Sequence, residues 1–186
     1  LTQELAITGA KITAIEKDLL MVDILKETLA NCKNVKVIQA DARNLIDLIE
    51  VGLQSDFKIV ANLPYNAATF LIRQWLESEN PPQMMVLMIQ KEVARRIVAK
   101  PPHSNLLGVS VQFYAEAKII DYVKKESFWP KPKVDAAIIK ITPKISKKNG
   151  HIKPIGLKQS FAYFRVVKAG FSQPRKQLIS NITKKL

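Results

Sequence analysis

Short apolar runs alternate with helix-like segments along most of the chain, and this alternation limits the possible folds more than any other feature. The strand-like runs cover residues 11–15, 35–38, 57–61, 84–89, 118–123 and 135–142. Segments with helical spacing or capping signals cover residues 2–8, 19–29, 45–49, 67–76, 91–98 and 106–115. Strands that alternate with helices predict a parallel, doubly wound α/β sheet. The last two runs have no helix between them, so they predict an antiparallel edge.

One strand-like run ends in a corner that could bind a nucleobase. Residues 57–61 lead into Asn62-Leu63-Pro64-Tyr65. Pro64 fixes its own φ and biases Leu63 toward an extended conformation, so the Leu63 carbonyl can point outward beside the Asn62 amide oxygen. Tyr65 adds a ring on which a base can stack. The alternative is an ordinary strand-to-loop turn in which Asn62 bonds its own backbone.

Two acceptors at such a corner suit methyl transfer to an exocyclic amine. The lone pair of this amine is delocalised into the base, which makes it a poor nucleophile. Oxygens that hold both of its hydrogens favour a pyramidal nitrogen whose lone pair faces an incoming methyl group. This chemistry requires positioning and preorganised dipoles, and it needs no general base before the transfer.

Two acidic residues follow consecutive strand-like runs. Glu16 comes at the end of residues 11–15, and Asp41 follows residues 35–38. In nucleotide-binding α/β sheets, a carboxylate at a strand end accepts from ribose hydroxyls, and a second one can accept from an adenine amine. We therefore expect both acids at the edge of the sheet that carries the Asn62 corner. Each could instead be a helix cap or a solvated loop residue.

The net charge of +13 is concentrated near the carboxyl terminus. Residues 1–135 contain 17 Lys and Arg against 16 Asp and Glu, whereas residues 136–186 contain 12 Lys and Arg and no acid. A neutral body joined to a cationic segment is typical of a protein that binds a polyanion; a solvated basic face is the alternative. Its apolar side, which we expect to dock on the body, comprises Phe161, Phe164, Val167 and Phe171. The cations lie mainly off that side and include Lys158, Arg165 and Lys168.

Other classes of protein are disfavoured by composition. The single cysteine, Cys32, excludes an internal disulfide and suits the reducing cytoplasm. Neither His103 nor His151 has a partner at metal-ligand spacing, so we expect no metal site. No apolar run approaches membrane-spanning length. We expect a cytoplasmic monomer that binds neither metal nor membrane.

Six blocks of sequence, in order, resemble a known family. They read AIEKD at 14–18, QADA at 39–42, NLPYN at 62–66, QKEVA at 90–94, FWPKPKVD at 128–135 and AGFSQPRK at 169–176. With these blocks the chain resembles the ribosomal RNA adenine dimethyltransferases, specifically the small-subunit, KsgA-type branch. The resemblance implies a Rossmann-like class I methyltransferase sheet with an antiparallel edge, followed by a small basic helical domain. It places the methyltransferase domain at 1–142 and the RNA-binding domain at 143–186, with a linker at 143–151.

The resemblance also implies a cofactor, a substrate and residue roles. The methyl donor is S-adenosylmethionine, and the substrate is a pair of adjacent adenosines in the 3′-terminal hairpin of small-subunit ribosomal RNA, within the immature small subunit. Cofactor binding falls to Glu16, Lys17, Asp41, Ala42 and Asn62. The chemistry falls to Asn62, Leu63, Pro64 and Tyr65, with Phe128 closing on the other face of the target base. RNA binding, from the resemblance together with the charge pattern, falls to Lys91, Arg95, Arg96, Lys131, Lys133, Arg165, Lys168, Arg175 and Lys176.

Some of these roles have plainer alternatives. Phe128 could be a hydrophobic plug of its proline-rich loop, and Lys91, Arg95 and Arg96 could form a solvated helix face. The family's amino-terminal strand and Gly-rich cofactor loop have no counterpart here, so we expect the catalytic domain to lack its amino-terminal part. We likewise expect the carboxyl-terminal domain to be cut short at Leu186.

Two other functions remain open from the sequence. The first is the large-subunit ribosomal RNA adenine methyltransferase that confers macrolide resistance, which typically carries Ile where Leu63 stands. The second is a non-catalytic RNA or DNA binder, such as a ribosome-assembly factor or a mitochondrial transcription factor of the same fold.

Overall fold

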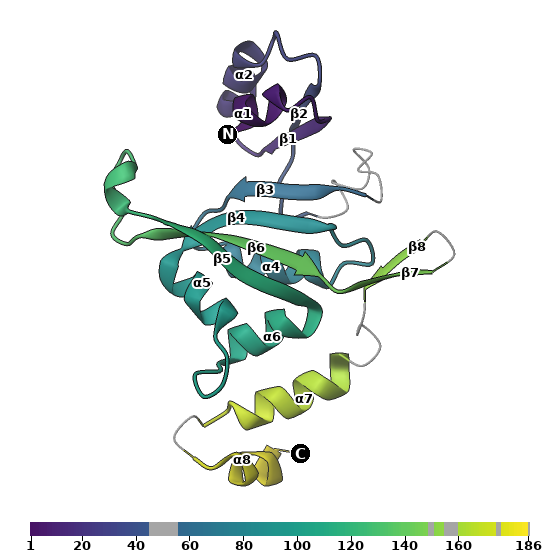
Figure 1. The fold of residues 1–186 in the computed structure, drawn as a ribbon, viewed down its shortest axis with the longest axis vertical. Helices are drawn as coiled ribbons and strands as arrows, with labels where there is room; N and C mark the ends of the chain where they lie inside the picture. The colour runs from purple at the N-terminus through teal and green to yellow at the C-terminus, as the bar shows by residue number, and fades with distance from the viewer. Residues whose placement is uncertain (45–55, 149–150, 155–159, 174–175, 186) are drawn as a thin grey trace. The chain divides into compact units, whose positions relative to one another are not determined.

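The computed structural model describes residues 1–44, 56–148, 151–154, 160–173 and 176–185 (Figure 1). The helix predicted at 45–49 lies outside these residues. The chain divides into two compact units, Leu1–Gln54 and Ser55–Leu186.

The described part of the first unit contains a pair of parallel strands and two helices. Its elements are α1 (Thr2–Ile7), β1 (Ile12–Glu16), α2 (Leu19–Thr28) and β2 (Val35–Gln39). Strands β1 and β2 pair in parallel, with Glu16 opposite Gln39. Asp18 caps α2, and its carboxylate accepts from the backbone N–H groups of Leu20 and Met21, as its sequence predicts. Gly9 has a φ of 76° just after α1, a conformation that favours glycine.

Helix α2 buries only a narrow stripe of its apolar side chains. Val22 of the helix and Leu29, its C-cap residue, are buried, with 1% and 5% of their surfaces exposed. Other large apolar residues of this helix are exposed: Leu19, Leu20, Met21 and Ile24. Because stable helices bury an apolar face, the packing of this helix within its own unit rests on few contacts.

The second unit contains a mixed four-stranded sheet. Its strands are β3 (Lys58–Asn62), β4 (Met84–Gln90), β5 (Ala115–Val123) and β6 (Ala136–Pro143), in the order β3-β4-β6-β5. Strands β3 and β4 are parallel, whereas β6 is antiparallel to both β4 and β5. The predicted α/β class with an antiparallel edge is therefore confirmed.

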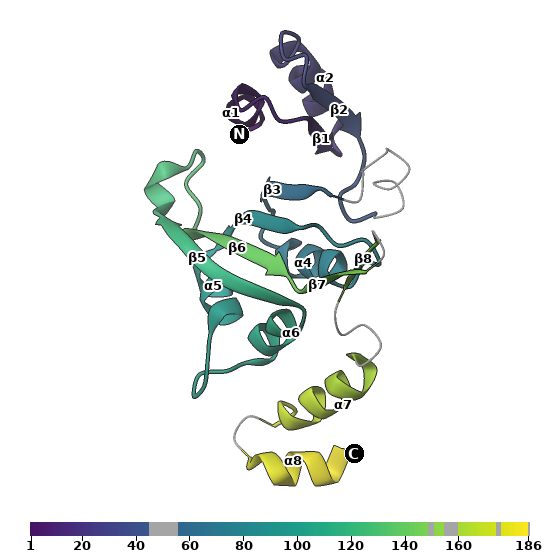
Figure 2. The same cartoon turned by 45° about the vertical axis from the view of Figure 1, so that its right-hand side comes forward.

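Three helices cover one face of this sheet (Figures 1 and 2). They are α4 (Ala68–Leu76), α5 (Lys91–Val98) and α6 (Leu106–Tyr114). Alternate residues of β4 are fully buried, namely Met85, Leu87 and Ile89. The intervening residues are half-buried, which is the period-two pattern of a strand with one covered face. The core of the second unit therefore lies between this face and the helices.

The linker predicted at 143–151 is wrong over much of its length. Strand β6 extends to Pro143, and β7 (Ile145–Lys148) then pairs antiparallel with β8 (His151–Pro154). Polar and turn-forming residues in this segment predicted a linker, so the short strands were not recognised from the sequence. The Asn149-Gly150 dipeptide between them is itself a sequence signal for a hairpin, and it was available from the sequence.

Two basic helices follow, where the sequence predicted a basic helical segment. They are α7 (Ser160–Gly170) and α8 (Leu178–Lys185). Tyr163 of α7 stacks on Phe113 of α6, with ring centroids 4.1 Å apart. The buried Asn181 side chain of α8 donates to the carbonyls of Gly170 and Gln173, at 2.9 and 3.0 Å, and so joins the two helices.

The docking side of α7 differs from the prediction at Phe161. This residue is 77% exposed, whereas Tyr163 and Phe164 make the ring contacts to α6. At 3.6 residues per turn, Phe161 lies well round the helix from Tyr163 and Val167, so it cannot face the same neighbour. The boundary at residues 142/143, between the predicted methyltransferase domain and the predicted RNA-binding domain, stays a prediction. None of the described helices combines the length and apolarity needed to cross a membrane.

The burial of β4 predicts a large effect of truncation in its centre. Leu87→Ala should lower the free energy of unfolding by about 2–5 kcal/mol, because it leaves a cavity in a fully buried site. Urea unfolding followed by the fluorescence of Trp75, which is 3% exposed, measures this change. Ile120→Ala at a 52% exposed position is the control and should change stability by less than about 0.5 kcal/mol. Equal losses in the two variants would contradict this account of the core.

Candidate active site

In the first unit, Glu16 and Asp41 follow neighbouring strand ends. Glu16 is the last residue of β1, and its carbonyl accepts from the N–H of Ala40 at 3.0 Å. Asp41 comes next in the chain. Parallel strands place their carboxyl ends at one edge of a sheet. The predicted placement of the two acids at successive strand ends is confirmed, while their roles stay predictions.

The Glu16 carboxylate is oriented by its own backbone. Its Oε1 accepts from the N–H groups of Lys17 and Asp18, at 2.7 and 2.9 Å. In the part of the chain that the structure describes, no group donates to Oε2. This half-buried carboxylate is therefore fixed in direction and retains an oxygen for the hydroxyls of a sugar.

The Asp41 carboxylate is already paired with two cations. The Arg43 guanidinium donates from Nε to both carboxylate oxygens at 3.0 Å and from Nη2 to Oδ2 at 2.6 Å. Lys17 Nζ lies 3.1 Å from Oδ2. Hydrogen bonds from the side chain and backbone of Arg43, and then from Lys17, hold the pKa of Asp41 well below its usual range. An adenine amine would have to displace one of these donors. The sequence did not predict that Asp41 is already paired. Ala42 lies half-buried between Asp41 and Arg43.

In the second unit, the Asn62 corner continues the pairing of β3 with β4. Asn62 lies opposite Met88, and the Leu63 N–H donates to the Met88 carbonyl at 3.1 Å. The Leu63 side chain is buried, Asn62 and Pro64 are exposed, and Tyr65 is half-buried. Among the described residues, neither the Asn62 amide nor the Leu63 carbonyl has a hydrogen-bond partner. Both predicted acceptors are thus available, and the turn in which Asn62 bonds its own backbone is not formed.

The loop that carries Phe128 lies at the same edge of the sheet (Figure 1). This loop, residues 124–135, includes the short 3-10 helix η1 (Lys125–Ser127) and joins β5 to β6. Gln90 at the end of β4 pairs with Ala136 at the start of β6. Since Asn62 ends the parallel neighbour of β4, strand pairing brings the Asn62 corner and the half-buried Phe128 to one edge.

Asp135 ties the loop to helix α5. Its carbonyl accepts from the Lys91 N–H at 3.0 Å, and its Oδ2 lies 2.9 Å from Lys91 Nζ. Its Oδ1 accepts from the Lys125 N–H at 3.2 Å. Lys91, and then Lys125, lower the pKa of Asp135 below its usual value. Sequence reasoning gave Asp135 no role; its place at the end of the FWPKPKVD block was the only available signal.

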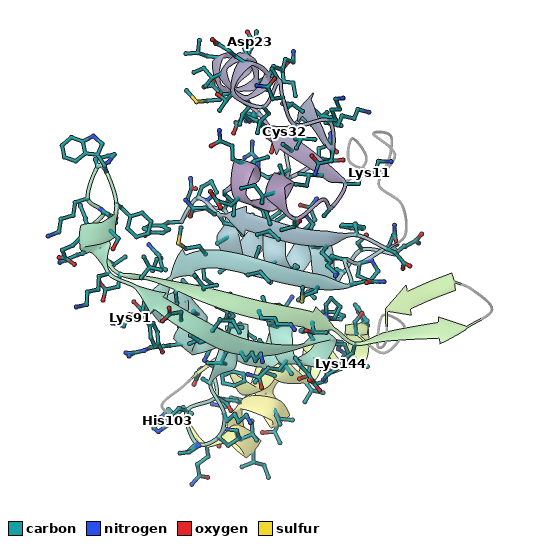
Figure 3. The ribbon with its side chains drawn as sticks, turned by 45° about the horizontal axis from the view of Figure 1, so that its top comes forward. Lys11, Asp23, Cys32, Lys91, His103 and Lys144 are labelled. Atoms are coloured by element: carbon teal, nitrogen blue, oxygen red, sulfur yellow. The ribbon has the colours of Figure 1, made fainter. Side chains whose placement is uncertain are left out.

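Three of the predicted RNA-binding cations gather at an open pocket of about 370 Å³ beside this loop. Its charged lining residues are Lys91, Glu92, Arg95, Lys125, Lys133 and Asp135. Lys91, labelled in Figure 3, is the first residue of α5. Arg96 is exposed and is not part of this lining. Lys125 was missed by sequence reasoning, because one lysine among many carries no local signal.

The remaining predicted cations are dispersed. Lys131 pairs with Glu126 at 2.9 Å, and this pairing lowers the pKa of Glu126. Arg165 and Lys168 are exposed on α7, and Lys176 is exposed between α7 and α8, while Arg175 lies outside the described residues. Within the described ranges there is no group of three or more His, Cys, Asp or Glu side chains that could hold a metal ion.

Comparison with known proteins adds the family context. The family model described as "Ribosomal RNA adenine dimethylase" matches residues 1–186. A relative from Geobacillus thermodenitrificans, named ribosomal RNA small subunit methyltransferase A, is 36% identical over 192 residues, covering 100% of this chain and 64% of the relative. A protein of the same name from Bacillus licheniformis is 38% identical over 193 residues, with the same coverage. The chain thus spans just under two thirds of the curated relatives it matches.

Two solved structures share the fold. A dimethyladenosine transferase from Plasmodium falciparum is 26% identical, with a TM-score of 0.69, over 92% of this chain and 58% of that one. The 23S rRNA methyltransferase ErmE has a TM-score of 0.73 at 22% identity, over 99% of this chain and 70% of that one. At this identity the second likeness supports the fold alone.

The ion pair at Asp41 predicts a shift in its titration. Arg43→Met should raise the pKa of Asp41 toward its ordinary value, because Arg43 is the main cause of its depression. A depressed carboxylate pKa stabilises the folded state above the unfolded pKa, and this stabilisation is lost as pH falls through the folded pKa. Protonation of Asp41 should therefore begin at higher pH in the variant, as measured by carboxyl ¹³C NMR. Arg73→Met, which breaks the pair with Glu77 in the second unit, should leave the Asp41 titration unchanged.

Proposed function

Because the chain belongs to the ribosomal RNA adenine dimethylase family, we propose that it methylates adenosine amines in ribosomal RNA, with S-adenosylmethionine as methyl donor. The proposed substrate is a pair of adjacent adenosines in the 3′-terminal hairpin of small-subunit ribosomal RNA, each dimethylated on its exocyclic amine within the immature subunit. The small-subunit name of the curated relatives supports this choice. We further propose that the protein acts as a cytoplasmic monomer.

One observation carries the proposal: the Asn62 amide and the Leu63 carbonyl stand at the end of β3 without partners among the described residues. Such oxygens can accept both hydrogens of an adenine amine, which turns the nitrogen lone pair out of the ring plane. Tyr65, half-buried two residues further on, can stack on the base with about 1–3 kcal/mol of favourable free energy. Pro64 holds the turn between them.

The same oxygens also suit the charge that develops during the reaction. When bound, S-adenosylmethionine would supply a methyl group from a positively charged sulfur, which would keep the electron pair of the broken carbon–sulfur bond and leave as a neutral thioether. As the adenine nitrogen gains that methyl group it becomes cationic, and the two carbonyl dipoles of Asn62 and Leu63 stabilise this charge. The extra proton can then pass to water, because Asn62 is exposed. Phe128, at the same edge of the sheet, would close on the other face of the base.

The first unit offers residues that fit the adenosine part of the cofactor. Glu16 Oε2 would accept from the ribose hydroxyls, and the backbone of Lys17 and Ala42 would lie alongside. Asp41 would accept from the adenine amine after releasing a donor from Arg43 or Lys17. Release of Lys17 costs little, because its side chain is 66% exposed. Asn62 remains the proposed cofactor contact of the second unit.

A methyl-transfer assay tests the proposal. With the complete gene product, unmodified small ribosomal subunits should accept labelled methyl groups, and Asn62→Ala should reduce the rate at least about 100-fold, because one preorganised dipole is lost. Asn31→Ala, at an exposed asparagine of the first unit, should keep the parent rate. RNA binding by Asn62→Ala should remain close to that of the parent.

The assay separates the other functions considered above. Absence of transfer by the parent protein, with RNA binding intact, would favour a non-catalytic binder. Preferential transfer to naked large-subunit RNA would favour the large-subunit enzyme and count against the small-subunit substrate.

A further inference from the structure

The loop between β5 and β6 presents an almost fully solvated tryptophan. Trp129 is 98% exposed, whereas Trp75 in the same unit is 3% exposed. Scattered apolar residues on a surface are common and need no explanation by themselves. The surroundings of Trp129 distinguish it, because the loop that carries it is both anchored and cationic.

The loop is held by several local contacts. Asp135 accepts from the Lys125 N–H and pairs with Lys91, so that both ends of the loop are fixed beside α5. The Ser127 N–H donates to the Lys124 carbonyl at 3.0 Å, closing a turn just before Phe128. Two prolines follow Trp129 within three residues and restrict the backbone on its carboxyl-terminal side. The indole is therefore presented from an ordered loop.

Trp129 and Phe128 point in different directions. Phe128 has an extended backbone, with φ of −115° and ψ of 148°, and successive side chains of an extended chain project to opposite sides. Phe128 is half-buried and Trp129 is solvated, in agreement with this alternation. The two rings therefore cannot hold the same base, and Trp129 is available to a different nucleotide.

The base of the loop carries unneutralised positive charge. Lys91 pairs with Asp135, and Lys131 pairs with Glu126, so these cations are largely compensated. Lys125 and Lys133 line the pocket with Arg95, and neither lysine side chain has an ion-pair partner among the described residues. The Arg95 guanidinium lies 5.6 Å from the centroid of the Tyr122 ring and makes a cation–π contact with it. Glu92 also lines the pocket and has no ion-pair partner among the described residues, so three cations stand there against one uncompensated acid. The net positive charge suits an anion such as a phosphate.

We propose that this loop is a second RNA-binding site, in which Trp129 stacks on an unpaired nucleobase while Arg95, Lys125 and Lys133 hold a phosphate of the same strand. The proposal rests on the proposed function for the identity of the polyanion. Stacking requires an unpaired base, so Trp129 selects single-stranded nucleotides outside the Asn62 corner. The phosphate contacts add affinity and carry no sequence information. A protein partner is disfavoured, because four lysines lie within the same loop.

Binding measurements without cofactor test the site directly. The probes are a short RNA hairpin with an unpaired loop and a fully paired RNA duplex of equal length. Trp129→Ala should weaken binding of the hairpin about 5- to 100-fold, as expected for the loss of one base–aromatic contact, and should change duplex binding little. Trp129→Phe should retain most of the affinity, because a flat ring remains. Hairpin binding should also quench the indole emission of the parent protein.

Matched variants separate stacking from charge. Lys125→Ala combined with Lys133→Ala should reduce the slope of log affinity against log salt by about 1 to 2, whereas Lys118→Ala on β5 should leave it unchanged. Ile120→Ala, an exposed apolar residue of β5, should bind the hairpin like the parent. Unchanged urea unfolding, followed through Trp75, shows that each variant is folded.

The outcomes distinguish this site from the proposed reaction. Equal hairpin affinities for the parent, Trp129→Ala and Trp129→Phe would overturn the site, even if methyl transfer proceeds normally. Weaker binding of both Trp129→Ala and Trp129→Phe would exclude stacking. Retained RNA affinity in Trp129→Ala with lost binding to protein components of the small subunit would identify a protein-docking residue and also overturn the site. A Trp129-dependent hairpin affinity in a protein without methyl transfer would support the site and reject the reaction.

Discussion

Strand β4 determines where the candidate residues of the second unit lie, because its two neighbours run in opposite directions. Its parallel partner β3 ends beside it at Asn62, and its antiparallel partner β6 begins there, just after the loop that carries Phe128. One face of β4 is fully buried under the helices. A slip of one residue would turn that face outward, so burial fixes the register. The Asn62 corner and the loop share an edge for this reason.

Electrostatic pairing decides which of the many cations can meet a phosphate. Most acids near the sites are paired: Asp41 with Arg43 and Lys17, Glu126 with Lys131, and Asp135 with Lys91. Glu92, which lines the pocket, has no ion-pair partner among the described residues. Formal charge along the sequence therefore overstates the positive charge available at any one place. Around the loop, the available charge is that of Arg95, Lys125 and Lys133, which come from two elements far apart in the chain.

The sequence predicted features that depend on neighbours along the chain. The apolar run at 84–89 identified β4, and Asp18 identified the start of α2 because a short acidic side chain can accept from the first N–H groups of a helix. The extended corner after β3 followed from the restriction that Pro64 places on Leu63. Hairpin β7–β8 was missed because its composition resembles a loop. The exposure of Phe161 could not be predicted, because α7 has two overlapping sides that could be buried, and its packing on α6 determines which one is.

Local sequence patterns predicted the kind and order of most elements, the acids at or just after the ends of β1 and β2, and the two acceptors where β3 ends. These features arise from local periodicity, capping and backbone restriction, which act over a few residues. The tertiary structure was needed to show that Asp135 meets Lys91, that Arg43 and Lys17 already pair with Asp41, and that Trp129 stays in solvent. Lys91 and Asp135 are 44 positions apart, and such contacts depend on which strands pair and in which direction, a choice that no local pattern encodes.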